Sequence, residues 1–156
     1  MHTLLIAVGK LRPYYREACD DYLGRLRHYG GMEEKEVRAA GRAATPELSR
    51  REEAQRIARA LTPDALVIAL DRAGSAWSSE ALAQRLQGWL NASAAPTLLI
   101  GGACGLDAEL LRRARHRWSL GPLTLPHELA RVVVAEQWYR AWTILRGEPY
   151  HKGGTA

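Results

Sequence analysis

The apolar positions of the chain form short runs that are separated by segments of helical periodicity. Uninterrupted apolar runs such as residues 4–8 and 97–100 are typical of strands that are covered on both faces of a sheet. The charged run 32–37 predicts a weaker strand at or near an edge. The five expected strands are residues 4–8, 32–37, 65–70, 97–100 and 118–120, with a turn predicted over residues 71–75 after the third.

Segments with helical spacing of apolar residues lie between these strands. Helices are expected to begin at Pro13, at Pro46, at Ser78 or Ser79, at Asp107 and after His127, and the last helix is expected to end near Arg146. Strands that alternate with helices in this way predict a mostly parallel sheet with helices on both faces. The sequence therefore indicates a single α/β domain over residues 1–156.

The last predicted helix is apolar around almost its whole circumference. A helix of this kind must be covered on more than one side. The sheet can cover one side, and we expect a second copy of the chain to cover the other, in a homodimer with Trp138 or Trp142 in contact with the partner. The alternative is a helix that is buried entirely within its own domain.

Composition and charge place the chain among soluble globular proteins. Hydrophobic residues make up 47% and charged residues 25% of the sequence, and no apolar run is long enough to span a membrane. The apolar start indicates a buried strand and not a signal peptide. Cys19 and Cys104 show no spacing typical of a metal site or a disulfide framework, so we expect a cytoplasmic protein without a metal. The net charge of +5 is compatible with a nucleic-acid partner.

Two segments are candidates for ligand binding. The glycine-rich turn 100–107 follows a predicted strand, where parallel sheets bind ligands, although its spacing is also that of an ordinary tight turn. The segment 118–127 is apolar and contains two prolines and a glycine, so we expect it to be buried. An adenosyl group could then satisfy its backbone groups. The alternative is a packed crossover between a strand and a helix.

Motifs near the C-terminus closely resemble one family. Residues 123–133 (LTLPHELARVV), 136–141 (EQWYRA) and 146–152 (RGEPYHK) are similar to the ribosomal RNA large subunit methyltransferase H family, the pseudouridine N3-methyltransferases of the SPOUT superfamily. Residues 7–11, Leu70-Asp71 and 100–106 resemble the same family, so the similarity covers nearly the whole chain.

The resemblance implies more than the pattern alone. It implies a C-terminal trefoil knot, a homodimer, and S-adenosylmethionine bound in the knot in a bent conformation. The implied substrate is a pseudouridine of large-subunit ribosomal RNA, methylated at N3 in assembled ribosomes. The implied cofactor-binding residues are Leu70, Gly101, Leu120, Gly121, Pro122, Leu123, Thr124 and Leu125.

Methyl transfer from a sulfonium to a ring nitrogen requires orientation of the reactants and removal of the N3 proton, and it requires no metal. His127 beside the cofactor loop and His151 in the tail are the candidate bases, although His127 could instead cap the last helix. The candidate RNA contacts are Arg131, Arg140, Tyr150 and Lys152. Arg140 could instead pair with Glu136, and Tyr150 could merely anchor the tail.

Three other functions remain compatible with the pattern. They are a knotted methyltransferase that acts on transfer RNA, a non-catalytic RNA-binding dimer, and a flavodoxin-like module. Residues 153–156 extend past the family's usual ending and are expected to be disordered.

Overall fold

The computed structural model describes residues 1–42 and 45–153. Its elements are β1 (Thr3–Val8), α1 (Pro13–Leu26), η1 (Arg27–Tyr29), β2 (Met32–Val37), α2 (Pro46–Ala60), β3 (Leu66–Ala76), α3 (Ser79–Asn91), β4 (Pro96–Ile100), α4 (Ala108–Arg113), β5 (His116–Ser119), α5 (His127–Leu145) and η2 (His151–Gly153). Gly153 thus lies in a 3-10 turn, and the expectation of disorder for 154–156 falls outside the described residues.

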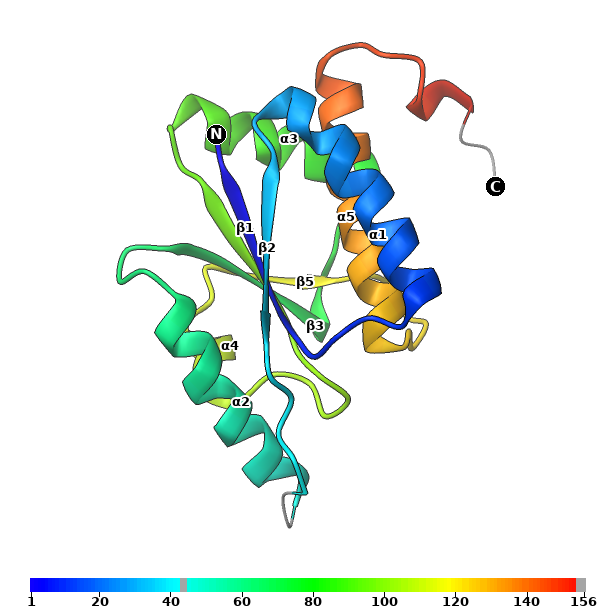
Figure 1. The fold of residues 1–156 in the computed structure, drawn as a ribbon. Helices are drawn as coiled ribbons and strands as arrows, with labels where there is room; N and C mark the ends of the chain where they lie inside the picture. Colours follow the sequence, from blue (N-terminus) through cyan, green and yellow to red (C-terminus); the bar gives the residue numbers. More distant parts are fainter. Residues whose placement is uncertain (43–44, 154–156) are drawn as a thin grey trace.

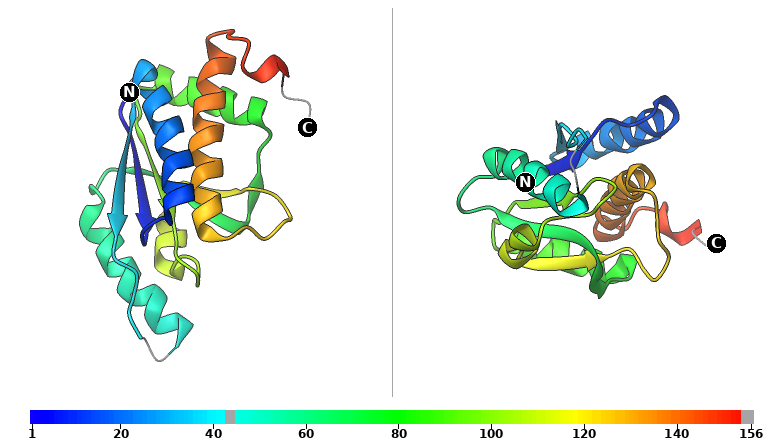
Figure 2. Two further views of the ribbon diagram at one scale, coloured as in Figure 1. Left: turned by 45° about the vertical axis from the view of Figure 1, so that its right-hand side comes forward. Right: turned by 90° about the horizontal axis from the view of Figure 1, so that it is seen from below.

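All five strands are parallel and lie in the order β2-β1-β4-β3-β5. Helices α1, α3 and α5 pack on one face, while α2 and α4 cover the other (Figures 1 and 2). The predicted α/β fold, with a parallel sheet and helices on both faces, is therefore confirmed. The charged strand β2 lies at an edge, as its sequence predicts.

Local sequence signals explain where the helices begin. Ser78 caps α3, because its hydroxyl accepts a hydrogen bond from the backbone N–H of Ala81, and Asp107 caps α4 in the same way. Pro46 occupies the first turn of α2, where its missing N–H leaves no bond unmade. These predicted helix starts are confirmed.

The turn predicted over residues 71–75 is wrong. The strand β3 continues to Ala76, and both Leu70 and Ser75 pair with Trp118 of β5. The register shift places residues 71–74 outside the regular pairing. Gly74 permits this arrangement, because a Cβ there would lie 2.5 Å from the backbone oxygen of Arg117.

The last helix is covered mainly by its own chain. It packs against α1, α3 and the sheet, and Trp138 is 0% exposed and Trp142 7% exposed. The contact of either tryptophan with a partner subunit stays a prediction: Trp138 has no exposed surface for it, whereas Trp142 lines a surface hollow beside Tyr29 and Leu145. No helix among the described residues is long and apolar enough to cross a membrane.

Candidate active site

A cavity of about 690 Å³ opens at the carboxyl ends of β4 and β5 and at residues 70–72 of β3, where the first stretch of regular pairing of that strand ends. Open parallel sheets bind ligands at this edge, because the loops that follow the strands converge there. The cavity brings together most of the predicted cofactor residues, namely Leu70, Gly101, Leu120, Gly121, Leu123, Thr124 and Leu125, and it also includes His127. Pro122 does not line it.

The glycine-rich turn after β4 forms one wall of this cavity. A Cβ on Gly101 would lie 2.6 Å from the backbone carbon of Gly105, so no side chain fits there. Gly105 has a φ of +78°, which favours glycine. The two ends of this turn lie so close together that Gly101 carries no side chain, and the turn presents main-chain atoms to the cavity.

The loop between β5 and α5 forms the opposite wall. Gly121 has a φ of +117°, and Ser119 fixes the turn because its hydroxyl accepts a hydrogen bond from the Gly121 N–H at 3.2 Å. The backbone N–H groups of Leu123, Thr124 and Leu125 make no hydrogen bond within the described part of the chain. All three residues line the cavity.

The expectation that this loop is buried is wrong at its centre. Leu123 is 75% exposed, and Pro122 and Thr124 are also exposed. The loop bounds an open cavity, so its apolar side chains have no cover within the described chain.

His127 lies at the first turn of α5 and lines the cavity. It does not cap the helix, because Pro126 occupies the N-cap position and no side chain accepts there. The neighbouring Glu128 is fixed by Arg12, whose backbone N–H and Nε donate to the carboxylate at 2.7 and 3.1 Å. These bonds lower the pKa of Glu128, the backbone bond most strongly. They also tie the start of α5 to the segment that precedes α1.

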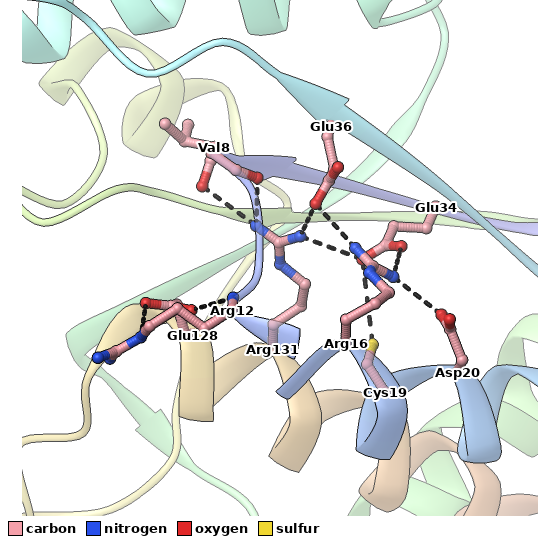
Figure 3. Close-up of polar contacts among 10 residues, drawn as sticks. Val8, Arg12, Arg16, Cys19, Asp20, Glu34, Glu36, Glu128 and Arg131 are labelled. Atoms are coloured by element: carbon pink, nitrogen blue, oxygen red, sulfur yellow. Dashed lines mark hydrogen bonds and ion pairs between the residues drawn. The ribbon is translucent and has the colours of Figure 1, made fainter. Parts of the chain in front are cut away.

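Arg131, which was predicted to contact RNA phosphate, has a structural role. Its side chain is 1% exposed and lies between two carboxylates of β2 and two carbonyls at the end of β1 (Figure 3). One terminal nitrogen binds Glu34 and Glu36, and the other donates to the carbonyls of Val8 and Gly9 at 3.1 and 2.8 Å. No terminal donor remains for RNA, so the predicted phosphate contact is wrong for Arg131.

The tail residues lie together, away from the cavity. Tyr150 donates to Glu136 at 2.8 Å, and Arg140 grips the same carboxylate through Nε and Nη2. Burial raises the pKa of Tyr150, and the bond to Glu136 raises it further. His151 forms a hydrogen bond with Arg140 at 3.0 Å, while Lys152 is exposed.

The two candidate bases are therefore not brought together in one protomer. His127 lies at the start of α5, and Arg140, which holds His151, lies about 20 Å further along at about 1.5 Å per residue. Figure 1 shows the cavity loop and the tail at opposite ends of this helix. Nδ1 of His151 accepts from Arg140, because a guanidinium only donates, and Nε2 donates to Glu80 at 2.8 Å.

Three residues of the cavity wall lie outside the segments that the sequence indicates. Asp71 and Arg72 follow the last regular pairing of β3, and Ala130 lies in α5. The rule that sites form at the carboxyl ends of parallel strands points to Asp71 and Arg72, but the local sequence of residues 71–75 predicts an ordinary turn. The described residues contain no cluster of side chains that could hold a metal ion.

Comparisons with known proteins agree with this architecture. The family model described as "Predicted SPOUT methyltransferase" matches residues 1–151. The chain is 50% identical over 152 residues to the ribosomal RNA large subunit methyltransferase H of Rubrobacter xylanophilus, which covers 94% of this chain and 96% of the relative. It is 44% identical to the protein of the same name from Alkalilimnicola ehrlichii and 42% identical to that from Nitratidesulfovibrio vulgaris strain DP4, each over 97% of this chain and 99% of the relative.

These matches cover the sheet, the cavity and the tail, so they concern the whole architecture and not one motif. The all-parallel sheet is compatible with the SPOUT fold, and family membership implies the C-terminal trefoil knot. A flavodoxin-like module is excluded by the same matches. The chain is a methyltransferase and belongs to the ribosomal RNA large subunit methyltransferase H family of the SPOUT superfamily.

Proposed function

We propose that this methyltransferase uses S-adenosylmethionine to methylate N3 of a pseudouridine in large-subunit ribosomal RNA, on assembled ribosomes. The observation that carries the proposal is the cavity at the carboxyl ends of the strands, with its unpaired backbone donors. The class of RNA is taken from the printed names of the relatives, which are ribosomal RNA large subunit methyltransferases.

The residues of the cavity fit an adenosyl group. Leu70, Leu120 and Leu125 supply apolar side chains that can cover the faces of a purine. The free N–H groups of the loop supply donors for polar atoms at its edge. When bound, S-adenosylmethionine supplies a methyl group that is already activated by the sulfonium. The chain must then orient the target nitrogen and accept its proton.

His127 is the better candidate for the base. It lines the cavity, and its ring makes no hydrogen bond to another described residue. In contrast, both ring nitrogens of His151 are engaged, by Arg140 and by Glu80. A base must reach its proton within about 3 Å with a free lone pair, which His151 lacks on its own protomer.

We propose a homodimer that uses a different surface from the one first expected. Tyr14 is 58% exposed and Leu123 is 75% exposed, and these are the two most exposed large apolar side chains. They lie near the N-terminal ends of α1 and α5, which the Arg12–Glu128 pair joins. A second copy that covers this end would bury both residues. Sedimentation should then report twice the chain mass of 17.3 kDa, and Tyr14→Lys should shift the protein towards monomer.

Arg140, Tyr150 and Lys152 remain proposed RNA contacts. Deletion of residues 150–156 removes the bonds of Tyr150 and His151 but leaves the cavity intact. We expect cofactor affinity to be unchanged and methyl transfer at low ribosome concentration to fall at least ~10-fold, because a base stacked on an aromatic side chain contributes about 1–3 kcal/mol. Lys152→Gln alone should weaken ribosome binding and leave the rate at saturation unchanged. Parental transfer by the truncated enzyme would contradict a role for the tail.

The function is tested by the transfer of labelled methyl from S-adenosylmethionine to isolated ribosomes, to free ribosomal RNA and to transfer RNA. We expect label on ribosomes, in a nucleoside that yields N3-methylpseudouridine after digestion. His127→Asn should bind cofactor normally and transfer at least ~100-fold more slowly. Label on transfer RNA alone, or cofactor binding without transfer to any RNA, would reject the proposal.

A further inference from the structure

A second cleft lies at the β5 edge of the sheet, on the other side of the segment that bounds the cofactor cavity. It has a volume of about 350 Å³ and is lined by residues 73–75 and by Trp77, Arg85, Arg115, His116 and Arg117. Arg72 faces the cofactor cavity, whereas the next residues face this cleft. The same division occurs in β5, where Trp118 lines the cavity and Arg117 lines the cleft. The two hollows therefore share a wall.

The lining of this cleft carries three guanidinium groups and no carboxylate. Arg85 and Arg115 form no ion pair with any described residue, and both are exposed. Arg117 pairs with Asp71, whose carboxylate lies 3.8 Å away and outside the lining of the cleft. This contrasts with Arg16 and the other arginines around β2, where Glu34 and Glu36 neutralise the charge.

Trp77 orients one of these cations. The Arg85 guanidinium lies 4.2 Å from the centre of the Trp77 ring, and Trp118 stacks on that ring at 5.4 Å with 12° between the planes. A guanidinium held over an aromatic face keeps its in-plane donors free for a planar or tetrahedral anion. The indole N–H of Trp77 is buried and has no acceptor in the described part of the chain, so the ring meets the cleft through its face and not through this donor.

The pKa of His116 reflects the positive charge of the cleft. Burial lowers the pKa of His116, and the charges of Arg85 and Arg115 lower it further. The lowered pKa favours the uncharged imidazole. The His116 ring packs edge-on against the Trp77 ring, with 5.8 Å between the ring centres, and adds no further charge to the cleft.

We propose that this cleft binds a phosphodiester of the substrate RNA beside the nucleotide that is methylated, with Arg85 and Arg115 as its main ligands. The inference rests on the proposed function, because it places the RNA backbone across the wall between cleft and cavity. Charge-assisted bonds from arginine to phosphate give affinity and position without reading the base sequence. An RNA strand bound here would bring its neighbouring base to the mouth of the cofactor cavity.

The test compares Arg85→Gln with Arg115→Gln, singly and together, against the parent enzyme. The double variant should raise the KM for ribosomes about tenfold and leave kcat and the affinity for S-adenosylmethionine unchanged. The slope of log affinity against log salt should become shallower by roughly 0.7–0.9, which is the value for one lost phosphate contact. Arg115→Lys, which keeps the charge, should recover most of that slope. Retained cofactor binding shows that the variants are folded.

A matched control removes two charges elsewhere. Arg27 and Arg59 are exposed, form no ion pair with described residues, and do not line the cleft. The variant with Arg27→Gln and Arg59→Gln should keep the parental KM and salt slope. Equal losses in the control and in the cleft variant would overturn the inference, because the effect would then come from net charge alone.

The outcomes separate this inference from the proposed function. If the parent methylates ribosomes and the cleft variant does so with parental KM and salt slope, the inference fails and the proposed function stands. If the parent binds ribosomes but transfers no methyl group, the proposed function fails, and the salt slopes of binding still decide the inference. If the parent does not bind ribosomes, both fail. Loss of inorganic phosphate binding in the variants, with ribosome binding unchanged, would identify a site for small anions and overturn the RNA contact.

Discussion

Replacement of Arg131 by methionine should strongly destabilise the fold. The guanidinium is 1% exposed and binds two carboxylates and two backbone carbonyls. Its loss would leave the carbonyls of Val8 and Gly9 without this donor, and it would leave the carboxylates of Glu34 and Glu36 with Arg16 as their remaining arginine. Breaking one partner of a buried ion pair costs about 3–5 kcal/mol. Because Arg16 remains, we expect about 3 kcal/mol.

The measurement is urea unfolding followed by circular dichroism, with an unchanged m-value as the sign of a change in stability alone. Arg112→Gln is the control. Its pairing with Glu109 joins side chains that are 64% and 85% exposed, so its loss should cost less than about 0.5 kcal/mol. A loss of less than about 1 kcal/mol for Arg131→Met would refute the structural role of this residue.

The same variant separates two interpretations of Arg131. A phosphate ligand would lower ribosome affinity and the salt slope while leaving unfolding unchanged. A structural cation would lower stability and leave the salt slope of the folded protein at the parental value. We expect the second result.

Three further predictions concern the cavity and its surroundings. Gly121→Val should abolish cofactor binding in calorimetry, because a β-branched residue at φ +117° is strained. Leu123→Asp should leave the fold intact, since Leu123 is 75% exposed, but it should weaken cofactor binding at least tenfold, because a carboxylate covered by the bound cofactor is costly. Normal binding by both variants would contradict the site. A thiol reagent at pH 8 should label Cys104, which lines the cavity, and S-adenosylhomocysteine should protect it, whereas burial raises the pKa of Cys19 to about 12 and keeps that thiol unreactive. The pKa of His116 is lowered in the folded protein, so its contribution to stability is complete above about pH 6.5 and is lost as pH falls further. His116→Gln should therefore reduce the dependence of the unfolding free energy on pH below that value.

The alternation of apolar runs and helical segments predicted the layers of this fold, because each strand and helix carries its own pattern. It did not predict that β3 continues past Leu70. Residues 71–75 contain Asp71, Gly74 and Ser75, which favour turns locally. A second pairing with Trp118 overrides that preference, and such pairing depends on where β5 lies. The local pattern of apolar residues does not predict contacts between segments that are far apart in the chain.

The same limit applies to charge. Arg131 and Arg115 are the same residue type, and neither sequence neighbourhood shows which of them is buried. The structure separates them through the strand at each edge of the sheet. The β2 edge supplies Glu34 and Glu36, which neutralise Arg131 in the interior. The β5 edge supplies no carboxylate to its cleft, so Arg115 keeps its charge at the surface. A count of positive residues therefore indicates an anionic partner but does not locate it.

The apolar pattern of the last helix predicts how much of the helix is covered but not which segments cover it. Its apolar circumference correctly indicated that it is covered on several sides, but not what covers it. The chain itself supplies α1, α3 and the sheet, so Trp138 is already fully buried in one protomer. The large apolar side chains that remain uncovered include Tyr14 and Leu123, and these are the residues that our proposed partner covers. Because Leu123 also bounds the cofactor cavity, a partner that covers it would close the cavity as well. Dimer formation and cofactor affinity should therefore change together in variants of this loop.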